Sequence, residues 1–164
     1  MEWIFTSDGP DSTRQLGNII GRTVRGGELI CLQGNLGAGK TILTQGIASG
    51  LEVKEWINSP TFNLIIEYEG RLPLYHMDLY RIDNPEMLFD IGFEEYIHGE
   101  GVAVIEWAEK AVPFIPEEHL LIRIESLEMD GDAETDSRRL HARASGDRHI
   151  ELLKGMIEHA GLRD

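Results

Sequence analysis

The sequence predicts a single α/β domain, in which a mixed central β-sheet is flanked by helices. Three observations indicate this class. A short apolar strand leads through a glycine-rich loop into an amphipathic helix, two extended runs then follow around a tight turn, and later apolar runs alternate with helical patterns. With 164 residues the chain has the length of one ordinary domain. We therefore expect residues 1–164 to form one domain.

Each element follows from the spacing of its apolar residues. Helices are expected where these residues recur every three or four positions, and strands where short apolar runs are bounded by turn residues. In chain order we expect a helix over 12–25, a strand over 28–33, a helix over 40–51, extended runs over 62–68 and 72–79, a short helix over 85–93, strands over 102–105, 120–124 and 140–144, and a helix over 147–160.

Some of these elements have distinctive ends or patterns. Asp11 or Ser12 is a suitable cap for the first helix, because short polar side chains accept hydrogen bonds from free N–H groups there. The three residues 69–71 between the extended runs suit a hairpin. The run 102–105 is apolar throughout, which is typical of a strand buried on both faces.

Composition limits the possible functions. The formal net charge of −14 argues against a broad phosphate-binding surface for nucleic acid and favours an oppositely charged protein partner. The only cysteine, Cys31, lies in an apolar run and reads as a small buried side chain. No apolar run approaches the roughly 20 residues of a membrane span, and the N-terminus does not resemble a secretory signal. We expect a cytoplasmic protein without membrane contact.

The segment Gly34–Thr41 matches the phosphate-binding P-loop pattern G-x-x-x-x-G-K-[ST] in full. It begins where a buried strand ends and finishes where a helix begins, which is the context that the pattern requires. Glycines let backbone N–H groups converge on phosphate oxygens, and the helix N-terminus favours negative charge. Lys40 is expected to reach the β- and γ-phosphates and Thr41 to bind Mg²⁺. The predicted phosphate-binding residues are Gly37, Ala38, Gly39, Lys40 and Thr41.

A P-loop needs an acidic group near the metal, usually at the end of a neighbouring strand. Asp78 and Glu106 each close a predicted strand. Either carboxylate is able to hold Mg²⁺ directly or through water, or to orient the attacking water. In the segment 59–62, a hydroxyl such as that of Thr61 is a further candidate for the metal shell. We expect His76 to face sideways rather than bind metal, and Trp107 to be either a core residue or a surface aromatic.

Five segments of the chain form a more specific pattern than any one of them alone: Gly34–Thr41, Ser59-Pro60-Thr61-Phe62, Tyr75-His76-Met77-Asp78-Leu79-Tyr80-Arg81, Gly92-Phe93-Glu94-Glu95-Tyr96 and Ile105-Glu106-Trp107. The Leu-Tyr-Arg and Glu-Trp elements among them are not general P-loop features. In order and spacing, and over nearly the whole chain, these segments resemble the bacterial TsaE family, the ATPase subunit of tRNA threonylcarbamoyladenosine biosynthesis.

The resemblance implies a small P-loop ATPase that uses ATP and Mg²⁺ and acts with two partners, TsaB and TsaD. In that system TsaD transfers the threonylcarbamoyl group to the tRNA adenosine beside the anticodon, so tRNA contact by this chain is expected to be indirect. By position, the resemblance implies that Lys40 binds phosphate, that Thr41 and Glu106 lie at the metal, and that Asp78 is the catalytic acidic residue. Trp107 lies beside the site. The family also places a residue near the start of the first helix against the nucleotide, here Ser12 or Thr13.

The chain departs from the family pattern at Ile42, where a second threonine usually follows the P-loop threonine. An isoleucine side chain cannot donate a hydrogen bond to an α-phosphate oxygen. That contact is therefore expected from a backbone N–H of Ile42, with nucleotide binding retained and affinity changed.

Other P-loop classes fit less well. A small GTPase is disfavoured because the chain has no Asn-Lys-x-Asp segment for reading guanine. A small-molecule kinase using the same loop is the main alternative, but such enzymes usually bring several arginines over the phosphates. The stretch between Ile82 and Arg123 contains no arginine. A nucleotide-gated binding module with negligible turnover is the third class.

Overall fold

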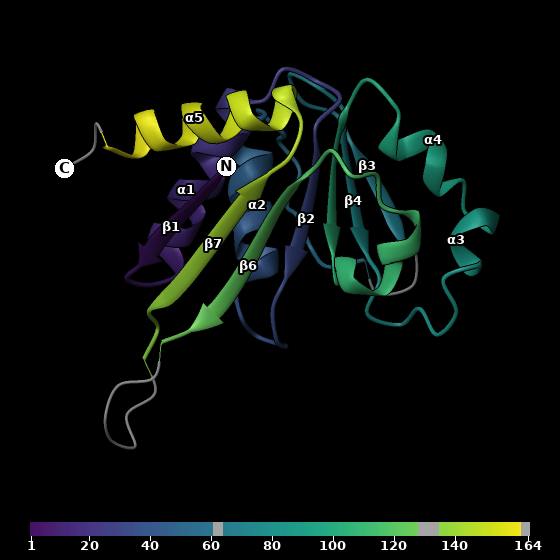
Figure 1. The fold of residues 1–164 in the computed structure, drawn as a ribbon, viewed down its shortest axis with the longest axis horizontal. Helices are drawn as coiled ribbons and strands as arrows, with labels where there is room; N and C mark the ends of the chain where they lie inside the picture. The colour runs from purple at the N-terminus through teal and green to yellow at the C-terminus, as the bar shows by residue number, and fades with distance from the viewer. Residues whose placement is uncertain (61–63, 128–134, 162–164) are drawn as a thin grey trace.

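A seven-stranded sheet forms the centre of the molecule (Figure 1). The structure is a computed structural model that describes residues 1–60, 64–127 and 135–161. The strands are β1 (Glu2–Ser7), β2 (Leu29–Gln33), β3 (Ile65–Tyr68), β4 (Leu74–Asp78), β5 (Val102–Glu106), β6 (Leu120–Ser126) and β7 (Arg138–Ala144).

The strand order is β1-β7-β6-β2-β5-β4-β3. The four central strands β6, β2, β5 and β4 are parallel, whereas β1 and β7 on one side and β3 on the other pair antiparallel to their neighbours. Parallel strands have their carboxyl ends at the same edge of a sheet, which is where ligands bind in open α/β folds. The ends of β2, β4 and β5 therefore meet at one edge.

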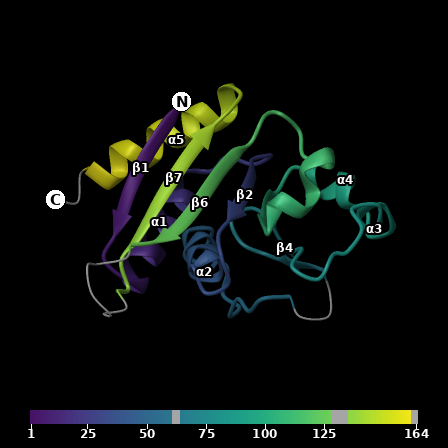
Figure 2. The same cartoon turned by 60° about the horizontal axis from the view of Figure 1, so that its bottom comes forward.

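Helices cover both faces of the sheet, so the predicted mixed α/β class is confirmed. One face packs against α1 (Pro10–Thr23), α2 (Lys40–Gly50) and α5 (Asp147–Gly161), and the other against α3 (Met87–Asp90), α4 (Phe93–Ile97) and the 3-10 helix η1 (Ala108–Phe114). In Figure 2, helices α1, α2 and α5 lie behind the half of the sheet that contains β1, β7 and β6. Helices α3 and α4 lie at the other end of the molecule, past β4.

The close contact between α1 and α2 fixes the position of the helix that follows the P-loop. A Cβ atom at Gly17 would lie 2.3 Å from the carbonyl oxygen of Leu43, and one at Gly21 would lie 2.1 Å from that of Ile47. Only glycine permits this approach of two helix backbones. On the sheet side of α2, Leu43 and Ile47 are completely buried, and burying each such side chain contributes about 1.5–3 kcal/mol.

Two predicted helix boundaries are wrong. The first helix begins at Pro10 after the N-cap residue Gly9, without a side-chain cap from Asp11 or Ser12. Proline has its φ angle preset for the first helical position, so the helix starts earlier than the polar residues suggested. The single helix expected over 85–93 is two short helices, α3 and α4. Gly92, with φ of 72°, adopts a left-handed conformation between them.

The other predicted elements are present with small shifts at their ends, and two further elements appear. The extended runs form the expected antiparallel hairpin of β3 and β4; residues 62 and 63 of the first run lie outside the described residues, as does most of the acidic loop 128–136. Strand β1 at the sheet edge and helix η1 were not predicted. Within the described ranges, no helix is both long and apolar enough to cross a membrane.

Candidate functional site

The P-loop lies directly after β2 and leads into the first turn of α2. Its glycines Gly37 and Gly39 have φ angles of 80° and 112°, and among the described residues that are not close neighbours in the chain, no heavy atom lies within 4 Å of the position that a Cβ would take at either. Side chains at these two positions would be strained and would project into open space. The loop is thus a concave stretch of backbone at the start of a helix, as an anion-binding site requires.

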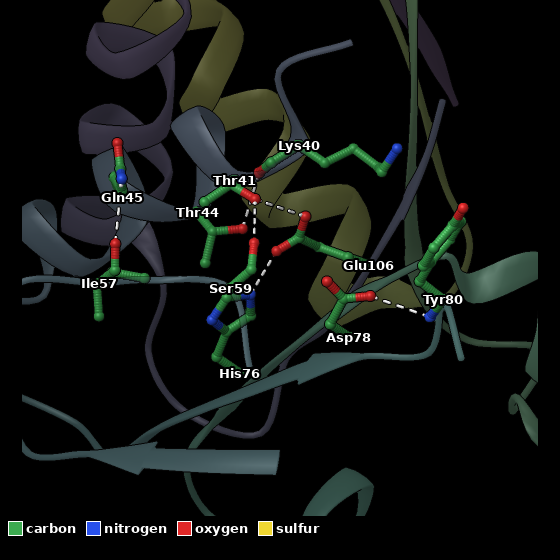
Figure 3. A network of polar contacts seen from close by, with 10 residues as sticks. All are labelled: Lys40, Thr41, Thr44, Gln45, Ile57, Ser59, His76, Asp78, Tyr80 and Glu106. Carbon is green, nitrogen blue, oxygen red and sulfur yellow. Dashed lines mark hydrogen bonds and ion pairs between the residues drawn. The ribbon is translucent and has the colours of Figure 1, made fainter. Parts of the chain in front are cut away.

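Thr41, in the first turn of α2, contacts the end of β5. Its Oγ1 donates a hydrogen bond to Glu106 Oε1 over 3.0 Å and lies 2.9 Å from Ser59 Oγ (Figure 3). Glu106 is 2% exposed, and its second carboxylate oxygen lies 2.5 Å from Nε2 of His76. The structure therefore brings the predicted residues Thr41 and Glu106 into direct contact, although they are 65 positions apart.

Asp78 lies beside Glu106 because the two residues are register partners at the ends of β4 and β5. The Asp78 carboxylate accepts a hydrogen bond from the backbone N–H of Tyr80 over 3.0 Å and is directed toward Glu106 in Figure 3. Partial burial raises the pKa of Asp78 above its ordinary value, and the Tyr80 N–H opposes this rise. Both candidate carboxylates thus lie at the sheet edge that carries the P-loop.

Lys40 and Trp107 meet above the P-loop. The Lys40 ammonium donates hydrogen bonds to the carbonyls of Gly34 and Asn35, the latter over 3.0 Å, and lies 4.1 Å from the centre of the Trp107 ring. Burial lowers the pKa of Lys40, and the nearby Glu106 carboxylate opposes this shift. Trp107 is half-buried with a left-handed φ of 60°, and its ring centre lies 5.0 Å from that of Tyr80. It is therefore neither a core residue nor a freely exposed aromatic.

These side chains line an open cavity of about 220 Å³. It is lined by Leu36, Gly37, Ala38, Gly39, Lys40, Thr41, Ile42, Ser59, Asp78, Glu106 and Trp107. Hydroxyl and carboxylate oxygens next to an anion-binding loop are the donor set that suits Mg²⁺, which takes one or two protein carboxylates and completes its shell with phosphate and water. In the described part of the chain, no group of three or more His, Cys, Asp or Glu residues could enclose a metal by itself.

Two predicted residues, Ser12 and Thr13, do not line this cavity. Ser12 lies half-exposed in the first turn of α1, and Thr13 is buried there with its hydroxyl 2.7 Å from Ser7 Oγ. Contact of either residue with a nucleotide stays a prediction. Thr61 lies outside the described residues.

Two residues of the network, Ser59 and His76, were not singled out from the sequence as site residues. Ser59 belongs to the segment 59–62, from which a hydroxyl was expected near the metal. Its contact with Thr41 depends on the path of the loop that carries it, which the sequence does not specify. His76 was expected to face sideways and instead lies buried under Glu106. The available signal was its place two residues before Asp78, because residues i and i+2 of a strand share a face.

Known proteins resemble this chain in sequence and in fold. The family model "Threonylcarbamoyl adenosine biosynthesis protein TsaE" matches residues 7–138. The tRNA threonylcarbamoyladenosine biosynthesis protein TsaE of Treponema pallidum is 46% identical over 122 residues, which are 74% of this chain and 90% of that protein. The protein of the same name from Bacillus subtilis is 39% identical over 151 residues, which are 92% and 90% of the two chains.

A solved structure agrees with these sequence matches. The crystal structure of Bacillus subtilis YdiB superposes with a TM-score of 0.81 and 33% sequence identity, covering 98% of this chain and 97% of that chain. The family match extends from the end of β1 to the start of β7 and includes the P-loop and both strand-end carboxylates. This chain belongs to the TsaE family.

Proposed function

We propose that this protein is a Mg²⁺-dependent P-loop ATPase whose hydrolysis of ATP supports threonylcarbamoylation of tRNA adenosine by a TsaB–TsaD complex. The observation that carries the proposal is the contact of 3.0 Å between Thr41 Oγ1 and Glu106 Oε1 beside the open P-loop. A hydroxyl at the start of the P-loop helix and a carboxylate at a strand end are the two protein groups that hold Mg²⁺ in P-loop enzymes. Membership of the TsaE family and the names of its relatives support the link to tRNA modification.

The backbone N–H groups of Gly37, Ala38 and Gly39 and the start of α2 bind the phosphates in this proposal. Lys40 exchanges its two P-loop carbonyl acceptors for phosphate oxygens, and Trp107 keeps the ammonium beside the loop. Bound Mg²⁺ would neutralise charge on the β- and γ-phosphates. Thr41 and Glu106 would hold this ion, and the backbone N–H of Ile42 would bind an α-phosphate oxygen.

Asp78 orients and deprotonates the attacking water. Its raised pKa makes the carboxylate a better proton acceptor than an ordinary aspartate, and the hydrogen bond from Tyr80 fixes its direction. Because Asp78 and Glu106 end neighbouring strands, one carboxylate is available for the metal and the other for the water. This division of roles supplies the two carboxylates that Mg²⁺-dependent phosphoryl transfer to water requires.

The decisive experiment measures ATP turnover by the purified chain alone, with TsaB and TsaD added, and with tRNA present while threonylcarbamoyl transfer is followed. We expect slow turnover alone, stimulation by the two partners, and loss of both turnover and tRNA modification in the Lys40→Ala variant. The same assay with candidate metabolites tests the kinase alternative. Phosphorylation of a metabolite at a rate that ignores TsaB and TsaD would rule out the proposal.

A further inference from the structure

The buried side chain of His76 contacts the carboxylate of Glu106, which is the proposed metal ligand. It lies in β4, is fully buried, and places Nε2 2.5 Å from Glu106 Oε2. The other oxygen of the same carboxylate accepts the hydrogen bond from Thr41. Since an ionised carboxylate only accepts hydrogen bonds, His76 donates through Nε2–H. Both carboxylate oxygens of Glu106 therefore form a hydrogen bond, one with a residue of the sheet and one with a residue of α2 (Figure 3).

Burying the His76 ring lowers the stability of the fold. In the described structure its second nitrogen, Nδ1, is buried without a hydrogen-bond partner. The register partners of His76 are Val104 on β5 and Ile66 on β3, so the ring lies in an apolar layer. Burying an unpaired polar atom lowers stability, whereas an apolar side chain of similar size would fill the same space without that penalty. Among the described residues, the ring makes its one polar contact with Glu106.

We propose that His76 is a positioning residue that locks the Glu106 carboxylate in the orientation that faces Thr41 and the metal position of the P-loop. This inference rests on the proposed Mg²⁺-dependent function. A free glutamate side chain samples many rotamers, and holding it in one orientation before the metal arrives removes that entropic cost from binding. Groups that hold a metal ligand in this way typically change metal affinity or activity by about 10–100-fold when they are removed.

The test compares two substitutions in the full chain by ADP binding, which needs no turnover. His76→Leu removes the donor, and His76→Gln keeps an N–H donor near the position of Nε2. ADP affinity is measured by titration calorimetry in EDTA and over a series of Mg²⁺ concentrations, and stability by urea denaturation. We expect His76→Leu to raise the Mg²⁺ concentration for half-maximal tightening of ADP binding by about 10–100-fold. Its ADP affinity in EDTA should stay within about twofold of the wild type, and His76→Gln should recover most of the Mg²⁺ response.

The second buried histidine, His149 in α5, supplies a matched control. Like His76 it is buried, but its Nε2 accepts a hydrogen bond from the backbone N–H of Leu29, and it does not line the P-loop cavity. His149→Leu should leave the Mg²⁺ response unchanged even if it lowers stability. If His76→Leu does not fold, His76→Asn replaces it, because the shorter amide cannot reach Glu106.

The outcomes separate this inference from the proposed function. If the wild-type protein shows no Mg²⁺ dependence of ADP binding, the Mg²⁺ site of the proposed function fails and the role of His76 fails with it. If the wild type responds to Mg²⁺ and the donor-free variant responds equally, only the positioning role is overturned. Equal losses in EDTA and Mg²⁺, or a glutamine variant as defective as the leucine variant, also overturn it and indicate a structural histidine.

Discussion

Two pairs of buried glutamate and histidine side chains lie at opposite ends of the parallel strands. Glu106 and His76 lie at the carboxyl ends, beside the P-loop, and Glu28 and His149 lie at the start of β2. All four side chains are at most 4% exposed. The pairs are made of the same residue types at similar depth, so their contacts, rather than their burial, distinguish them.

At the start of β2 the side chains bind backbone. The Glu28 carboxylate accepts hydrogen bonds from the N–H groups of Arg25 and Gly26 over 2.7 and 2.8 Å, and His149 accepts one from Leu29 over 3.0 Å. At the P-loop end the partners are side chains. In the described structure, the Glu106 carboxylate forms hydrogen bonds only with Thr41 and His76. Backbone-bound side chains hold the chain path, whereas side chains bound to one another are able to exchange partners with a ligand. From this difference we predict that Glu28 and His149 stabilise the fold, whereas Glu106 and His76 serve the site.

The largest expected effect is on turnover at the P-loop end. Asp78→Asn keeps the size of the side chain and removes its basicity, so we expect kcat for ATP hydrolysis to fall by at least about 100-fold. ADP affinity and the urea midpoint should change little. Glu28→Gln is the control at the other end and should retain wild-type turnover. A wild-type rate in Asp78→Asn would remove this carboxylate from the mechanism.

The next effect is on stability at the start of β2. Glu28→Ala leaves two backbone N–H groups without their acceptor, so the free energy of unfolding should fall by about 1–3 kcal/mol. Turnover per folded molecule should remain within about twofold of the wild type. Urea denaturation and an ATPase assay at low temperature measure the two quantities. A variant of normal stability with reduced turnover would contradict the structural assignment of this pair.

A smaller effect concerns pH. Burial lowers the pKa of His149 below its ordinary value of 6.5, and Glu28 opposes this shift. The unfolded chain therefore takes up a proton at His149 as pH falls through 6.5, while the folded chain stays neutral until lower pH. The free energy of unfolding should decrease over that window, by at most about 1.4 kcal/mol per pH unit, and be unaffected at higher pH.

His149→Gln isolates this contribution because glutamine does not titrate and still offers an acceptor to Leu29. Urea denaturation between pH 8 and 5 should show a shallower loss of stability below pH 6.5 in the variant than in the wild type. Parallel pH profiles for the two proteins would show that the histidine stays equally protonated in both states.

The smallest effect is expected at Ile42, which lines the P-loop cavity and is half-exposed. Ile42→Thr adds a hydroxyl donor where the family pattern has one. One additional hydrogen bond to an α-phosphate oxygen is worth about 0.5–1.5 kcal/mol, which corresponds to roughly 2–10-fold tighter ADP binding. Calorimetry compares the two proteins, with Ile42→Val as the control that lacks a donor. Weaker binding by the threonine variant than by the valine variant would exclude this contact.

Local patterns predicted most of the fold. Strands β2 and β5 were evident as short apolar runs, and α2 followed from its period and from the P-loop before it, because these signals lie within one element. Strand β1 was missed since it is an edge strand whose side chains are mostly exposed or half-buried, and its pairing with β7 joins the two ends of the chain. The early start of α1 was missed because Pro10 outweighed the polar residues that follow it.

The sequence alone determined that a P-loop exists and that Asp78 and Glu106 end strands, because motif spacing and strand periodicity are local properties. Tertiary structure decided which groups meet there. Strand order places β4 beside β5, register sets Asp78 opposite Glu106, and the packing of α2 brings Thr41 to the same carboxylate. These contacts join residues 28–65 positions apart. Such contacts depend on how separate elements pack, which no local pattern encodes.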